Sequence, residues 1–147
     1  MPALHWVALL LRATATISAL CLVAAMVADS LRRGPGAWLV LLAVSHTFHF
    51  VFIVVRAVTT GIWTPRLAMA LTAILGGLAY VFIYLMAWRG KTHPGMWWVW
   101  AIFFLGYAPR AVATPWRGVV AVALLAAAVL RIWGRRPFSA KLPKAAE

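Results

Sequence analysis

The chain has 147 residues, of which 65% are hydrophobic and 11% are charged. Soluble globular domains carry about a quarter charged residues, so this composition excludes an ordinary soluble domain and favours an integral membrane protein. Fourteen basic residues against two acidic ones would suggest nucleic-acid binding in a soluble protein, but here they lie singly or in pairs between apolar segments. We therefore expect membrane lipids, and no nucleic acid, as partners.

Five apolar segments predict an all-α integral membrane protein, a bundle of five transmembrane helices. A spanning helix needs about 20 residues, and only a helix or a closed barrel satisfies its backbone in lipid. The alternation of polar and apolar residues that a barrel requires is absent from the sequence. The bundle occupies residues 1–134, and residues 135–147 form a basic cytoplasmic tail. The predicted spans are about 5–28, 37–58, 66–88, 96–113 and 116–133.

The connections between the segments support these boundaries. Glycine and proline combine with charged residues in RRGPG (32–36), TTGIWTP (59–65) and RGKTHPG (89–95). Tryptophans mark the segment ends, as in the aromatic belts of membrane proteins. Because the last two segments are the shortest, a four-span variant also remains open, with one of them re-entrant or at the interface.

The distribution of basic residues predicts the orientation. With five spans, nine basic residues fall on one side and five on the other, so the positive-inside rule places the C-terminus in the cytoplasm and the N-terminus outside. The first span is expected to be retained and not cleaved as a signal peptide, because no basic residue precedes it and Arg12 interrupts it. The abundance of Ala, Arg, Trp and Gly suggests a GC-rich bacterial genome, and hence the bacterial inner membrane.

The second span carries the polar sequence SHTFHF, residues 45–50, near its middle. Helical residues advance about 100° each, so Ser45, His49 and Arg56 fall on one stripe. His46 lies about 60° to one side, and both histidines can point into one cavity. Ionisable side chains at the bilayer centre usually face the bundle interior. Alternatively, both histidines hydrogen-bond to neighbouring helices and only hold the bundle together.

Three arginines and a tyrosine lean toward the outer leaflet above these histidines. With them the sequence predicts an outward-facing cavity with a basic rim and a histidine floor. The alternative for the arginines is that they reach the lipid head groups, and for the tyrosine that it packs in an aromatic stripe. The predicted ligand-binding residues are His46, His49, Ser45, Arg56, Arg12, Tyr107 and Arg110.

Haem b and a quinone are the candidate cofactors. A histidine at the midplane can ligate haem iron, and arginines near the surface can pair with haem propionates. However, His46 and His49 are three residues apart on one helix, so a second axial ligand would be His5 or would be lacking. No metal-ion site is expected, since zinc needs three or four ligands and the predicted spans contain no carboxylate.

We therefore expect a small polytopic membrane protein that binds a lipophilic or anionic ligand or cofactor, namely a quinone, a lipid or haem, at an intramembrane histidine site. A place in a membrane complex, with other subunits or further copies of the chain as partners, fits its small size. The alternative is a small intramembrane enzyme in which His46 or His49 acts as acid or base on a lipid-soluble substrate.

Overall fold

A computed structural model describes the backbone of residues 2–60 and 67–134, and the side chains of residues 5–60 and 74–134. The predicted all-α fold is confirmed, because these residues form helices and contain no strand. The predicted tail, 135–147, lies outside the described residues. The elements are α1 (Pro2–Ser30), α2 (Gly36–Thr60), α3 (Leu67–Arg89), α4 (Met96–Tyr107), the 3-10 turn η1 (Ala108–Arg110) and α5 (Pro115–Gly134).

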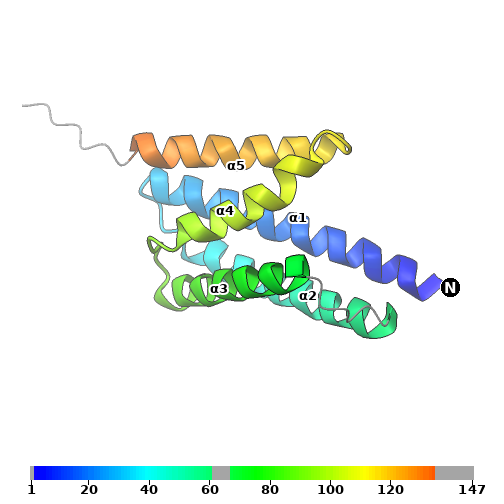
Figure 1. Ribbon diagram of the computed structural model, residues 1–147. Coiled ribbons are helices and arrows are strands. Elements are labelled where there is room, and N and C mark those ends of the chain that lie inside the picture. Colours follow the sequence, from blue (N-terminus) through cyan, green and yellow to red (C-terminus); the bar gives the residue numbers. More distant parts are fainter. Residues whose placement is uncertain (1, 61–66, 135–147) are drawn as a thin grey trace, which may run out of the picture.

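The helices form an antiparallel bundle in which α5 returns to lie beside α1 (Figure 1). Each helix packs against its neighbours in the chain, and the contact of α5 with α1 closes the bundle. Since the direction reverses at each connection, α5 runs the same way as α1.

Three helices are long and apolar enough to cross a membrane: His5–Ser30 of α1, all of α2, and α5. They indicate an integral membrane protein. Helix α3 has 23 residues, and the part of it whose side chains are described, Ile74–Arg89, is apolar. Helix α4 has 12 residues and gives way at Tyr107 to η1, whose Pro109 cannot continue the α-helical hydrogen bonds. The five-span bundle therefore stays a prediction.

The core lies between the inward faces of the helices, and the outward faces are largely apolar. Trp88, Leu105 and Val119 are examples of exposed apolar side chains, which are expected where lipid replaces water as the surroundings. Side chains with no exposed surface come from every helix: Leu22, Met26, Leu39, Leu42, Ile83, Met86, Met96, Val99 and Leu124.

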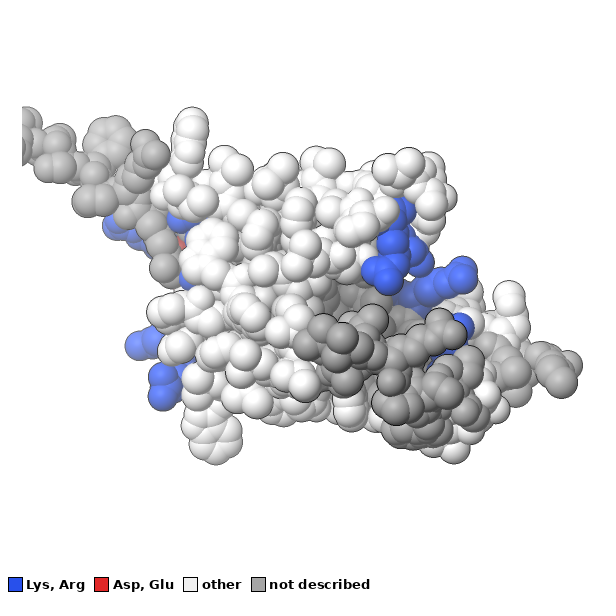
Figure 2. Space-filling model, viewed as in Figure 1, with Lys and Arg blue, Asp and Glu red and all other residues white. Residues whose placement is uncertain are grey.

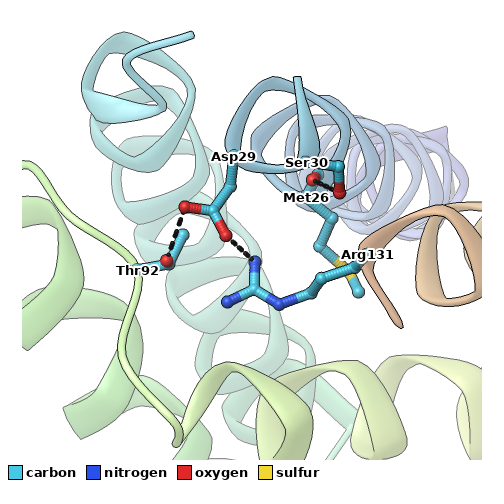
Figure 3. Close-up of polar contacts among 5 residues, drawn as sticks. All are labelled: Met26, Asp29, Ser30, Thr92 and Arg131. Carbon is cyan, nitrogen blue, oxygen red and sulfur yellow. Dashed lines mark hydrogen bonds and ion pairs between the residues drawn. The ribbon is translucent and has the colours of Figure 1, made fainter. Parts of the chain in front are cut away.

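An ion pair and a hydrogen bond join three parts of the chain at one end of the bundle (Figure 3). Arg131 of α5 is 1% exposed, and its Nη1 lies 2.6 Å from Oδ2 of Asp29 in the last turn of α1. Thr92, between α3 and α4, donates a hydrogen bond of 2.8 Å to Oδ1 of Asp29. We name Asp29, Thr92 and Arg131 the clasp, and the end of the bundle that contains them the clasp end.

The connection between α1 and α2 leaves the clasp through a tight turn. Arg33 donates its backbone N–H to the Ala28 carbonyl at 2.8 Å, and Arg32 donates to the Asp29 carbonyl at 3.1 Å. This is the Schellman pattern of a helix C-terminus, which places one residue in the left-handed region. Here that residue is Arg32, with a φ of 55°, where glycine is usual.

Candidate functional site

Ser45 links α2 to α1 near the middle of both helices. The hydroxyl oxygens of Ser18 in α1 and Ser45 lie 3.0 Å apart, within hydrogen-bond distance. Ser18 Oγ is also 2.8 Å from the Thr14 carbonyl, and Ser45 Oγ is 3.1 Å from the Leu42 carbonyl. Ser18 is completely buried. Ser45 is not hydrogen-bonded to either neighbouring histidine among the described contacts, so its observed role is to connect two helices.

His49 is oriented by α1. Its Nδ1 lies 3.1 Å from the carbonyl oxygen of Leu11 and 3.3 Å from Oγ1 of Thr14. A carbonyl oxygen can only accept, so Nδ1 of His49 carries the proton in this contact and Nε2 keeps its lone pair. The His49 ring therefore bonds α2 to α1.

His46 lies in an aromatic environment between α2, α3 and α4. The centre of its ring is 5.8 Å from those of His49 and Tyr80 and 5.5 Å from that of Phe103. Its Nδ1 is buried and has no hydrogen-bond partner within the described part of the chain. Since buried polar atoms are normally paired, His46 is a place where packing alone does not explain the residue.

Three hydroxyl groups form a chain beside His46. Thr47 donates to the Ala43 carbonyl at 2.7 Å, and the Tyr84 hydroxyl lies 2.5 Å from Oγ1 of Thr47. A threonine has one hydroxyl hydrogen, so when Thr47 donates to Ala43 the Tyr84 hydroxyl is the donor to Thr47. The Tyr80 hydroxyl also lies 3.2 Å from Oγ1 of Thr47. Tyr80 in turn donates to Tyr84 at 3.1 Å. We name Thr47, Tyr80 and Tyr84 the hydroxyl cluster.

A groove of about 760 Å³ runs along the outer face of α2 and α3 and reaches the hydroxyl cluster. Thr47 and Tyr84 contribute the hydroxyl groups of its lining, and His46 lies behind them, against Tyr80. We name it the α2–α3 groove. Its remaining lining is apolar or aromatic: Val40, Ala43, Val44, Phe48, Val81, Leu85, Ala87 and Trp88.

The described contacts do not join the predicted arginines to the histidines. Arg12 and Arg56 are exposed, and Nη1 of Arg110 in η1 donates to the Gly106 carbonyl of α4 at 2.6 Å. On the face shown in Figure 2, Lys and Arg side chains gather at the two ends of the molecule, with an uncharged band between them. The predicted cavity with a basic rim and a histidine floor therefore stays a prediction.

Tyr107 is buried near the end of α4. Its ring packs edge-on against Trp116 of α5, with the ring centres 6.2 Å apart. Its hydroxyl approaches Thr16 and Arg117 but makes no hydrogen bond of good geometry with a described residue. Tyr107 therefore belongs to the contact between α4, α5 and α1, away from His46 and His49.

Two groups of contacts are not predicted from the sequence. The clasp joins the first helix to the last. The sequence contains a clue to it, because Asp29 is the one acidic residue before Glu147 and is therefore the one carboxylate of residues 1–134 with which a buried arginine could pair. The hydroxyl cluster depends on how α2 and α3 are aligned. The spacing of Tyr80 and Tyr84 alone indicates only that they share a helix face.

No protein family model, no curated protein and no solved structure matches this chain. The chemistry of the site is therefore interpreted from its own geometry.

Proposed function

We propose that the chain is a five-helix membrane protein that binds a quinol, with the head group at the hydroxyl cluster and the apolar tail along the α2–α3 groove. The observation that carries this proposal is that two hydroxyl groups of the cluster, those of Thr47 and Tyr84, line a groove whose other walls are apolar. Ligand sites in proteins usually have this form, with a few convergent polar groups in an apolar pocket of about 300–1,000 Å³.

The position of the cluster along α2 supports a place at mid-membrane. Helix α2 begins at Gly36 at the clasp end, so His46 lies about 15 Å further along at a rise of about 1.5 Å per residue. This is about half of a hydrocarbon core of about 30 Å. On the same scale Arg12 lies about 27 Å from Ser30, at the level of the opposite head groups.

All five helices cross the membrane in this proposal. Helix α4 and η1 together reach about 24 Å, and a short span is accommodated by tilt of its neighbours or local thinning of the bilayer. The clasp end faces the cytoplasm of a bacterial cell, since it carries the exposed bases Arg32, Arg33, Arg89 and Lys91.

The hydrogen-bond directions favour a ligand that donates. Each hydroxyl hydrogen of the cluster already has an acceptor: Thr47 donates to Ala43, Tyr84 to Thr47, and Tyr80 to Tyr84. The Tyr84 oxygen keeps one lone pair. A quinol hydroxyl can donate to it without breaking a bond, whereas a quinone carbonyl, which only accepts, requires a hydroxyl of the cluster to turn away. The reduced form should therefore bind more tightly.

Haem and anionic ligands fit this groove less well. Neither histidine lines it, so a haem iron placed there would lack an imidazole ligand. Its lining also contains no basic side chain that could pair with a phosphate or carboxylate. A neutral head group is the remaining class.

The test compares the binding of a quinol and of its quinone to the full chain in lipid nanodiscs. Binding is measured by the quenching of tryptophan fluorescence, and Trp88 in the groove contributes to this fluorescence. Tyr84→Phe keeps the ring and removes the acceptor oxygen. It should weaken quinol binding about five- to tenfold, the equivalent of one hydrogen bond. Thr59→Val is the matched control, because it removes a hydroxyl of α2 whose hydrogen bonds to described residues all lie within its own helix.

The proposal predicts tighter binding of the quinol than of the quinone, and unchanged affinity in Thr59→Val. Equal affinity of the wild type and Tyr84→Phe for the quinol would contradict it, as would preference for the quinone.

A further inference from the structure

We propose that a second site, in the seam between α1 and α5, binds an anionic phospholipid of the leaflet opposite the clasp end. A groove of about 390 Å³ follows this seam. It lies on other helices than the α2–α3 groove, so this proposal does not depend on quinol binding. Its lining consists of Leu9, Arg12, Ala13, Thr16, Ile17 and Trp116.

Two arginines, Arg12 and Arg117, belong to the surroundings of Trp116 in this seam. Arg12 lines the groove together with Trp116, and the guanidinium of Arg117 lies 5.3 Å from the centre of the Trp116 ring. Among the residues that the structure describes, the one carboxylate is that of Asp29, at the clasp end. The charge of these arginines is therefore not balanced by a described protein group nearby, and guanidinium groups suit the two-oxygen geometry of a phosphate.

The rest of the seam suits an acyl chain. Ala13 leaves space beside Trp116, and Ile17 lies about 7.5 Å deeper along the helix axis than Arg12. The hydroxyl of Thr16 is bonded to the Arg12 carbonyl at 2.9 Å, so it presents no unsatisfied donor to the groove. The arginines lie at head-group level, and the groove beside them is apolar. This arrangement fits a phospholipid better than a soluble anion, because a soluble anion has no apolar part that could contact the groove.

The test is native mass spectrometry of the full chain in detergent, equilibrated with equal amounts of phosphatidylglycerol and phosphatidylcholine that carry the same acyl chains. The wild type should retain phosphatidylglycerol preferentially. Arg12→Gln and Arg117→Gln should each lower that preference about fivefold, as expected for one basic residue near a membrane surface. Arg33→Gln, an exposed arginine at the clasp end, is the matched control and should leave the preference unchanged.

A further variant, Ala13→Phe, fills the seam and keeps both arginines. It should lose the bound phospholipid while its quinol affinity stays at the wild-type value, which separates the two proposals. Thermal unfolding of each variant verifies that it is folded.

Equal retention of the two lipids by the wild type would overturn the proposal, and so would an equal effect of Arg33→Gln. A second experiment adds inorganic phosphate at millimolar concentration as a competitor of the lipid. We expect it not to displace the lipid, and displacement would assign the site to free phosphate instead.

Discussion

At the scale of single residues, the two histidines of α2 differ in what they contact. His49 donates to the Leu11 carbonyl of the neighbouring helix, whereas the buried Nδ1 of His46 has no partner among the described residues. The periodicity of α2 indicates that both face the interior, but it cannot assign their partners. Those depend on where Leu11 and Tyr80 lie along α1 and α3.

This difference predicts unequal effects on stability. His49→Leu should lower the free energy of unfolding by about 0.6–1.7 kcal/mol, the range for hydrogen bonds between membrane helices. His46→Leu removes a buried atom without a partner, so it should change stability by less than about 0.5 kcal/mol or increase it. Unfolding in mixed micelles of increasing denaturing detergent measures both, and equal losses would contradict these assignments.

The clasp predicts a coupled pair of substitutions. Arg131→Met alone leaves the Asp29 carboxylate, 18% exposed, without its buried cation, and should cost about 3 kcal/mol. Asp29→Asn alone should cost a similar amount, because the buried guanidinium of Arg131 then loses the Asp29 carboxylate as its ion-pair partner. The double variant should recover much of the loss, since neither charge remains. Additive losses in the double-variant cycle would show that the two residues act separately.

At the scale of the elements, the apolar segments and their Gly and Pro breakers made the helices predictable. The fourth segment shows the limit of such patterns. Hydropathy extends it over 96–113, but α4 ends at Tyr107 because Pro109 lacks the N–H that the helix needs. The pairing of α5 with α1 was not predictable, because every helix offers a similar apolar surface to several neighbours.

The start of α4 depends on one glycine. A Cβ on Gly95 would overlap with the ring of Phe82. That ring stacks on His93, with the ring centres 5.9 Å apart, and Nδ1 of His93 accepts the Gly95 N–H at 3.0 Å. Phe82 therefore cannot move without disturbing the turn that begins α4.

We expect Gly95→Ala to lower the free energy of unfolding by about 1–3 kcal/mol, as other overpacked substitutions do. Gly34→Ala is the control, because nothing lies within 4 Å of its added Cβ. The same detergent titration measures both variants. A Gly95→Ala protein as stable as Gly34→Ala would show that this contact is not close in solution.

At the scale of the whole molecule, composition alone indicated a membrane protein, and the three long apolar helices agree with it. The bundle places the clasp at one end, the seam arginines at the other and the hydroxyl cluster between them. Partner subunits or further copies of the chain stay a prediction. The histidine site predicted from the sequence stays a prediction. The α2–α3 groove lies beside it and is lined by residues that α2 and α3 contribute together.

The orientation can be tested with cysteines introduced at the two ends. Gly34→Cys lies at the clasp end, and Val112→Cys lies in the exposed connection before α5. In intact bacterial cells, a maleimide that cannot cross the membrane should label Val112→Cys and should label Gly34→Cys only after permeabilisation. The native Cys21 is buried and provides the background control. The reverse labelling pattern would place the clasp end outside.

The most direct test of the quinol proposal is photoaffinity labelling of the full chain in nanodiscs with a quinol that carries a diazirine on its tail, followed by peptide mapping. We predict that the label is concentrated on the two walls of the groove, residues 40–48 and 81–88, and that excess unlabelled quinol removes it. Label spread evenly over the lipid-facing surfaces of all helices, and unaffected by competitor, would contradict the proposed site.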